Sequence, residues 1–268
     1  MLRAVAIGWR AHRALRASGG AVRVTAPLSR SFYGEAAGEL VWVGVGDAAL
    51  HPRAVLVSAA PAHGRRVTVE GAADVRAWRP PLRPPFRPSS RAASRLRTAL
   101  ITAGDRCGLA RLIGAQGGGE DGGGEELVGG RARPCVAALT RACATDDAAA
   151  FCEAARPLLG LGHGLTPSGD DLVGGALFAR RTVIGMDAGW EAASLAITRA
   201  AADLTHPISA RLLADLAAGE GWAPLHDLTG ALTDDTGDPM PALRRLVAIG
   251  HSSGWDVAAG LLIGLARR

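Results

Sequence analysis

The sequence contains no lysine and no asparagine, and only one glutamine. Without lysine the chain has no Walker A motif, no Schiff-base lysine and no kinase-type phosphate contact. All 30 basic residues are arginines spread along the chain, a uniformity typical of GC-rich coding. Only four phenylalanines and one tyrosine could stack on bases. The net charge of +5 therefore does not indicate a nucleic-acid partner.

Long apolar runs and paired cysteines are also missing. The four cysteines form no Cys-x-x-Cys pair and have no histidine at zinc-finger spacing, which favours reduced thiols. Arg, Gly or Asp interrupts each apolar run before the roughly 18 residues that a membrane helix needs. In residues 1–20, Arg10 and Arg13 interrupt the apolar segment that a signal peptide needs. This pattern indicates a short amphipathic helix instead. We therefore expect a cytoplasmic protein with no membrane partner.

Two kinds of pattern divide the chain. Residues 1–88 contain short Val-rich segments, such as AVRVTAPLS and ELVWVGVG, bounded by Gly, Pro or Ser. Residues 78–90, WRPPLRPPFRPSS, hold five prolines, which exclude a continuing strand or helix. Ser89 or Ser90 is expected to cap a helix over RAASRLRTALITA, and from residue 134 onward apolar residues recur at helical spacing. We predict an α+β protein, with a β-rich subdomain (a small antiparallel sheet or barrel) at 1–88 and a helical-bundle subdomain at 89–268.

A low-complexity segment interrupts the helical part. Residues 114–130, GAQGGGEDGGGEELVGG, contain nine glycines and four acidic residues. This composition predicts a flexible surface loop. The acids argue against a phosphate cradle there, because they would repel the anion.

The most unusual segment is GLGHGLTPSGDDLVGGALF, at 160–178, and the segment GHSSGWDVAAGLL, at 250–262, partly repeats it. Each copy has a Gly-His pair, a short loop and the sequence Ser-Gly-x-Asp. That sequence predicts a capping box, in which the serine caps the helix and the aspartate bonds back to the serine amide. Glycines farther along allow backbones to approach closely. We therefore expect both helices to be buried and packed together.

Two converging helix starts suit a small anion. Their free N–H groups and positive dipole ends would bind a carboxylate or phosphate without lysine. His163 and His251 would donate to an oxyanion or move protons. Asp170 has no counterpart in the second copy, which makes it a candidate general base or an orienter of a histidine. The alternative is a pair of ordinary capped helices with tight turns.

A third segment, LTHPISARLLADL at 204–216, predicts another helix start at Pro207. Arg211 would clamp a carboxylate with two hydrogen bonds, the alternative being a surface arginine. Asp170, Asp171 and Asp256 with histidines could hold a divalent cation, but no fixed ligand spacing is present. We expect no metal and no cofactor.

Three segments, GLGHGLTPSGDDLVGG, THPISARLL and GHSSGWDVAAGLL, together resemble a bacterial family of domains of unknown function. One member of that family is a subunit of the oxamate carbamoyltransferase of anaerobic allantoin degradation. The segment SFYGEAAGELVWVGVGDAALHPRAVLV is weakly similar to the family's strand region. The resemblance implies carbamoyl transfer between oxamate and carbamoyl phosphate, with two other subunit types as partners. Family members usually carry proline where this chain has His163, which favours His251 as the catalytic histidine.

We therefore expect a carbamoyltransferase-type subunit that binds a small carboxylate or carbamoyl phosphate at paired helix starts. The alternatives are a non-catalytic subunit that binds or senses a small anion, and a metal-dependent hydrolase using Asp170, Asp256 and His251. The predicted catalytic residues are Asp170, His251 and His163. The predicted substrate-binding residues are Gly164, Thr166, Ser168, Gly169, Thr205, Ser209, Arg211, Ser253, Gly254 and Asp256.

Overall fold

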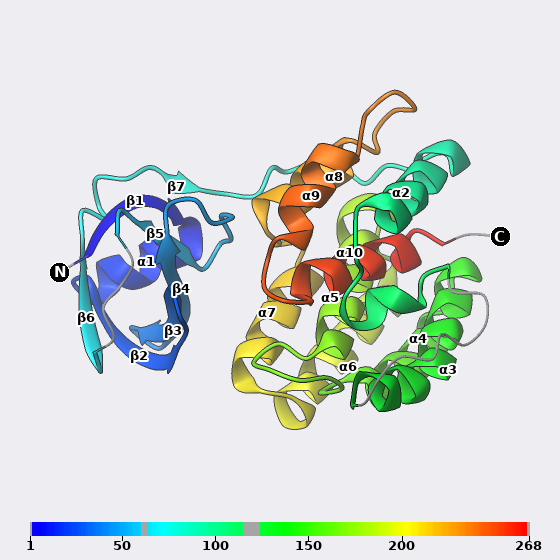
Figure 1. Ribbon diagram of the computed structural model, residues 1–268, viewed down its shortest axis with the longest axis horizontal. Coiled ribbons are helices and arrows are strands. Elements are labelled where there is room, and N and C mark those ends of the chain that lie inside the picture. Colours follow the sequence, from blue (N-terminus) through cyan, green and yellow to red (C-terminus); the bar gives the residue numbers. More distant parts are fainter. Residues whose placement is uncertain (1, 60–63, 115–123, 267–268) are drawn as a thin grey trace. The chain divides into compact units, whose positions relative to one another are not determined.

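The computed structural model describes residues 2–59, 64–114 and 124–266 of the chain (Figure 1). The chain divides into two compact units. Unit 1 comprises Met1–Pro81 with Gly221–Ala223, and unit 2 comprises Leu82–Glu220 with Pro224–Arg268. Strands precede most of the helices along the chain, so the predicted β-rich part followed by a helical part is confirmed.

Unit 1 is built on one sheet that closes on itself. Its strands are β1 Leu2–Gly8, β2 Ala21–Pro27, β3 Ser31–Ala36, β4 Glu39–Val45, β5 Ala54–Val57, β6 Arg66–Glu70 and β7 Ala77–Trp78. The strand order is β5-β4-β3-β2-β6-β1-β7, and β5 also pairs with β1, which makes a barrel. The sheet is mixed, because β1 runs parallel to β6 and β7, and β4 parallel to β5, while the other neighbours are antiparallel.

The barrel core is made of the inward-facing residues of these strands and one face of helix α1, Trp9–Ala17. In β3 every second residue is buried, as expected for a strand with one face on a core. The expected amphipathic helix over residues 1–20 is wrong for Leu2–Gly8, which form β1. Pairing with β5 and β6 outweighs local helix propensity there, because both partners come from distant parts of the sequence.

Unit 2 is helical. Residues 79–89, in the proline-rich segment, have neither helix nor strand, as predicted. The helices that follow are α2 Ser90–Thr102, η1 Gly108–Leu112, α3 Gly124–Ala144, α4 Ala148–Ala155, η2 Arg156–Leu158, α5 Ser168–Ala179, η3 Arg180–Ile184, α6 Ala188–Leu204, α7 Pro207–Ala217, α8 Ala223–Gly230, α9 Met240–Val247 and α10 Ser253–Gly264. Of the predicted flexible loop 114–130, residues 115–123 lie outside the described part, and residues 124–130 belong to α3.

Helices α5 and α10 form the centre of unit 2. Every residue of α5 is buried, and so is every residue of α10 after Ser253. Figure 1 shows α10 (red) among the other helices of this unit. The expectation that these two helices are buried is confirmed. Both sequences are rich in Gly, Ala and Leu, so no face of either helix suits solvent.

Candidate functional site

The two buried helices pack in parallel, and each places a glycine against the other's backbone. A Cβ atom on Gly175 would lie 2.3 Å from the carbonyl oxygen of Val257. A Cβ on Gly260 would lie 2.0 Å from the carbonyl oxygen of Leu172. These contacts are equivalent in the two copies of the repeat, so the repeat has a local two-fold arrangement. The starts of α5 and α10 consequently lie side by side.

A second pair of glycines fixes each helix start against the element before it. A Cβ on Gly169 would lie 1.9 Å from the Leu158 carbonyl oxygen, and a Cβ on Gly254 would lie 1.9 Å from that of Leu246. The amide of Gly169 donates to the Leu161 carbonyl at 2.9 Å, and the amide of Gly254 donates to the Ile249 carbonyl at 3.0 Å. These two amides are thus already bonded within the protein, and both glycines serve close packing.

The predicted capping boxes do not form, and this correction changes the chemistry of the site. Pro167 and Ser252 occupy the N-cap positions of α5 and α10, and neither makes a side-chain cap bond. The serine hydroxyls instead face the other helix. Thr166 Oγ1 lies 2.8 Å from Ser253 Oγ, and Ser168 Oγ lies 3.3 Å from Ser252 Oγ.

Asp256 is the most buried member of this group. Its side chain lies in the first turn of α10, and its Oδ1 accepts hydrogen bonds from the amides of Leu109 (2.7 Å) and Ala110 (3.2 Å) in η1. Its Oδ2 is buried without a hydrogen-bond partner among the described residues. Burial raises the pKa of Asp256 to about 7. The nearby hydroxyls of Ser168 and Ser252 oppose this rise without forming a hydrogen bond to Oδ2.

Asp171 is the equivalent residue of α5, which the sequence pattern predicted as a capping residue or, with Asp170 and Asp256, as a possible cation ligand. Its Oδ2 is also buried without a partner among the described residues. Burial first, and then the charge of Asp256, raise the pKa of Asp171 well above its usual range, while the hydroxyl of Ser253 opposes the rise. The repeat could have indicated this role, because Asp171 and Asp256 occupy matching positions in two helices that are otherwise mostly apolar. We call Thr166, Ser168, Asp171, Ser252, Ser253 and Asp256 the paired-helix cluster.

Asp170 has a different environment. Its Oδ1 accepts from the amide of Gly160 at 2.8 Å. Its Oδ2 accepts from the hydroxyls of Ser209, at 2.6 Å, and Thr205. Burial raises its pKa, and these three hydrogen bonds oppose the rise, Ser209 most strongly. Asp170 thus joins the first turn of α5 to the first turn of α7 rather than to a histidine, and α5, α7 and α10 all begin at this end of the unit.

The remaining predicted residues lie on the surface. His163, Gly164, His251 and Arg211 are all exposed. Gly164 has a φ of 93°, a left-handed conformation that glycine adopts without strain. His251 lies two residues before Ser253, on the turn that leads into α10. Among the described residues no three His, Cys, Asp or Glu side chains gather as metal ligands, so Asp170, Asp256 and His251 form no metal site.

The fold and the site define an α+β protein with a buried carboxyl and hydroxyl cluster where two small-residue helices begin. The family model described as oxamate carbamoyltransferase subunit AllH matches residues 158–265, which include all of the cluster. The resemblance expected from the sequence is therefore confirmed over that segment, about two fifths of the chain. Comparisons with curated proteins and with solved structures found no match. Within the described ranges, no helix combines the length and apolar character that crossing a membrane requires.

Proposed function

We propose that this chain is a subunit of an oxamate carbamoyltransferase-like enzyme and that its paired-helix cluster binds a small carboxylate or carbamoyl phosphate. The family match supports the first part, and a subunit implies an assembly of more than one kind of chain. One observation supports the second part. Two buried carboxyl groups meet four hydroxyl side chains where the helices begin, and each carboxyl group has one oxygen with no partner in the part of the chain that the structure describes. Buried polar atoms without partners are rare and need a cause, such as a ligand.

The cluster suits a carbamoyl group chemically. Carbamoyl transfer builds negative charge on the carbonyl oxygen and needs a proton for the leaving group. A carboxyl group with a pKa of about 7, such as Asp256, is partly protonated at neutral pH and donates a hydrogen bond in that form. The hydroxyls of Ser168 and Ser253 add donors, and the positive ends of α5, α7 and α10 favour an anion. No lysine is required.

In this proposal the exposed residues around the cluster handle protons and the second substrate. His251 delivers or removes a proton at the solvent side of the cluster, and Arg211 clamps the carboxylate of the second substrate. His163 and Gly164 belong to the loop through which the ligand enters. Thr205 and Ser209 act indirectly, because they hold Asp170 and so fix the start of α5.

The second candidate is a subunit that binds the same small anion without catalysing its reaction. The burial of Asp171 and Asp256, which are 3% and 0% exposed, favours this candidate because neither carboxyl group can exchange a proton directly with bulk water during a catalytic cycle. The two candidates differ in how a partner enzyme responds. A catalytic subunit sets the rate at saturating substrate, whereas a sensing subunit changes the substrate concentration at which the assembly responds.

The test is carbamoyl transfer by the reconstituted assembly, followed as phosphate release from carbamoyl phosphate in the presence of oxamate. We expect the double variant Ser168→Ala, Ser253→Ala to lose at least tenfold in kcat/KM, because it removes two donors and leaves both carboxyl groups. Ser194→Ala, at a buried serine of α6, is the matched control and should retain activity. Full activity in the double variant would refute the proposed site, and a change confined to KM would favour the sensing subunit.

A further inference from the structure

Asp171 is the carboxyl group of the paired-helix cluster whose presence the fold does not explain. It is 3% exposed, and its Oδ2 has no hydrogen-bond partner among the described residues. The hydroxyls of Ser253 and Thr166, rather than an arginine or a backbone amide, are the main groups that oppose the rise in its pKa. Burying a carboxyl group with so few partners destabilises a fold, so its presence needs another cause.

Asp256, at the matching position of the repeat, has a structural role that Asp171 lacks. Its Oδ1 accepts hydrogen bonds from the amides of Leu109 and Ala110 at the start of η1. Gly108 packs directly against the same carboxyl group, because a Cβ on Gly108 would lie 2.4 Å from Asp256 Oδ2. Over the ranges that the structure describes, no backbone amide bonds the carboxyl group of Asp171 in this way. Asp256 thus helps to hold η1 against α10, whereas the carboxyl group of Asp171 holds no neighbouring element in place.

A buried carboxyl group of this kind is complementary to a primary amide. Burial and the charge of Asp256 raise the pKa of Asp171 and so favour its protonated form. A protonated carboxyl group has an O–H donor and a carbonyl acceptor side by side. One edge of a –CO–NH2 group presents the matching pair, a carbonyl acceptor and an N–H donor, so the two groups can form two hydrogen bonds. A carboxylate or an acetyl group has no such N–H and leaves the acceptor of Asp171 without a partner.

We propose that Asp171 selects the carbamoyl group of carbamoyl phosphate, by accepting a hydrogen bond from its –NH2 and donating one to its carbonyl oxygen. This inference rests on the function proposed for the cluster and adds the residue that recognises the nitrogen. The –NH2 and –CH3 groups are nearly equal in size, so the shape of a site distinguishes carbamoyl phosphate from acetyl phosphate poorly. A buried acceptor that the methyl group leaves unpartnered distinguishes them strongly. Asp171 forms hydrogen bonds in this role and transfers no proton.

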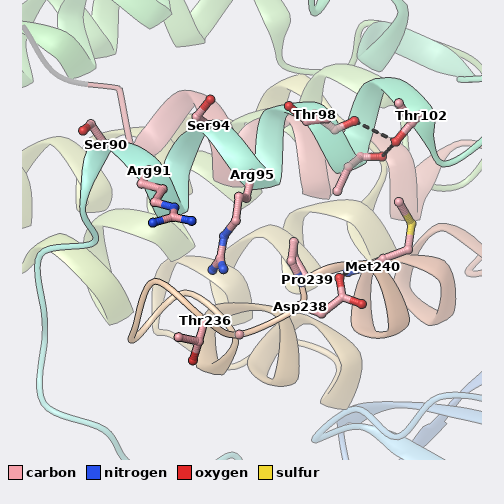
Figure 2. Close-up of a pocket in the computed structure, with 12 residues that line it drawn as sticks. Ser90, Arg91, Ser94, Arg95, Thr98, Thr102, Thr236, Asp238, Pro239 and Met240 are labelled. Atoms are coloured by element: carbon pink, nitrogen blue, oxygen red, sulfur yellow. Dashed lines mark hydrogen bonds between the residues drawn. The ribbon is translucent and has the colours of Figure 1, made fainter.

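A surface hollow of unit 2 offers another carboxyl group for comparison. Figure 2 shows this hollow between α2 and the segment 236–240, with Asp238 on that segment. Asp238 is exposed, and its Oδ1 accepts from the amide of Met240 at 2.9 Å. Solvent and this amide satisfy its oxygens, so it lacks the buried, unpartnered oxygen that Asp171 has. Asp238→Ala is therefore the matched control for Asp171→Ala.

The test compares carbamoyl phosphate with acetyl phosphate in the reconstituted assembly, followed as phosphate release in the presence of oxamate. The wild type should prefer carbamoyl phosphate by about a hundredfold or more in kcat/KM. Asp171→Ala should reduce this preference to below about tenfold, chiefly by losing activity on carbamoyl phosphate. Asp171→Asn should keep the preference within about threefold of the wild type, because its amide also places a donor beside an acceptor. Asp238→Ala should leave the preference unchanged.

Several outcomes would overturn the role of Asp171. Equal losses with both substrates in Asp171→Ala would show a structural role, and an unchanged preference would show no role in selection. Loss of the preference in Asp171→Asn would refute the hydrogen-bond pairing, and this arm remains decisive if the alanine variant does not fold. Loss of the preference in Asp238→Ala would place the carbamoyl group in the surface hollow. A wild type that uses both substrates equally would also overturn the inference.

Failure of the proposed function gives a different result. Full activity of the Ser168→Ala, Ser253→Ala variant would refute the cluster as the site, whatever the preference of Asp171→Ala. Loss of activity in that double variant, together with an unchanged preference in Asp171→Ala, would keep the site and refute only the role of Asp171. No phosphate release by the wild-type assembly would refute the proposed function and, with it, this inference.

Discussion

Asp256→Asn is expected to make the chain more stable at pH 8 than the wild type, by on the order of 2 kcal/mol or more. The pKa of Asp256 is raised by burial from 3.8 to about 7, so at pH 8 the folded protein holds an ionised carboxylate in its interior. Asparagine keeps an acceptor for the amides of Leu109 and Ala110 and carries no charge. It also removes the repulsion that raises the pKa of Asp171. Urea unfolding at pH 8 measures the free energy of unfolding of the wild type and of the variant.

The pH dependence of this difference follows from the direction of the shift. An acid whose pKa is higher folded than unfolded stabilises the fold fully below its unfolded pKa, here about 4, and this stabilisation is lost as pH rises through about 7. His226 acts in the opposite direction, because burial lowers its pKa to about 4 and its contribution is lost as pH falls from 6.5. Comparing wild type and Asp256→Asn at each pH cancels the contribution of His226. The advantage of the variant should therefore grow from pH 4 to pH 7 and then level off.

The same variant should lose carbamoyl transfer in the reconstituted assembly. A substitution that stabilises the fold and removes activity identifies a carboxyl group retained for function. Asp227→Asn is the control, because Asp227 forms an exposed ion pair with Arg245. Loss of that ion pair should change the free energy of unfolding by about 1 kcal/mol at most. An Asp256→Asn chain less stable than the wild type at pH 8 would contradict the assignment, because it would mean that the ionised carboxylate supports the fold.

Gly260→Ala is expected to destabilise the chain by about 3 kcal/mol or more, and Gly175→Ala by a similar amount. In each case the new Cβ would meet a backbone carbonyl of the other helix, at 2.0 Å for Gly260 and 2.3 Å for Gly175. A backbone atom cannot turn aside as a side chain can, so the two helices must separate in a tightly packed interior. The loss is large against the 5–15 kcal/mol that typically stabilises a folded domain. Urea unfolding at constant pH measures it.

A glycine in open space provides the comparison for this prediction. Gly130 lies inside helix α3, and beyond its chain neighbours and the backbone of its own helix no atom of the described residues lies within 4 Å of where its Cβ would be. Gly130→Ala should leave stability unchanged or raise it by up to about 1 kcal/mol, because alanine favours the helix. If the free energies of unfolding of the Gly260→Ala and Gly130→Ala variants differ by less than about 1 kcal/mol, helices α5 and α10 do not pack this closely.

The repeat explains why packing and chemistry lie together in this chain. In each copy, one glycine lets the helix start pack against the carbonyl of a preceding element. A later glycine lets the helix pack against the backbone of the other helix. The aspartate between them is carried into the interior by this packing. The cluster is therefore a consequence of bringing two small-residue helices together at their starts, and the Oδ2 atoms of Asp171 and Asp256 remain without a partner among the described residues.

The sequence by itself determined the order of strands and helices, the irregular proline-rich segment and the two buried helices, because each depends on residue types close together in the chain. It also identified the residues that form most of the cluster. It could not determine how they bond. Asp256 binds amides 147 and 146 residues away, and Ser168 and Ser253 face the other helix rather than cap their own. A hydroxyl or carboxyl oxygen accepts whichever donor folding brings nearest, so only the tertiary structure decided that the two capping boxes would become one shared cluster.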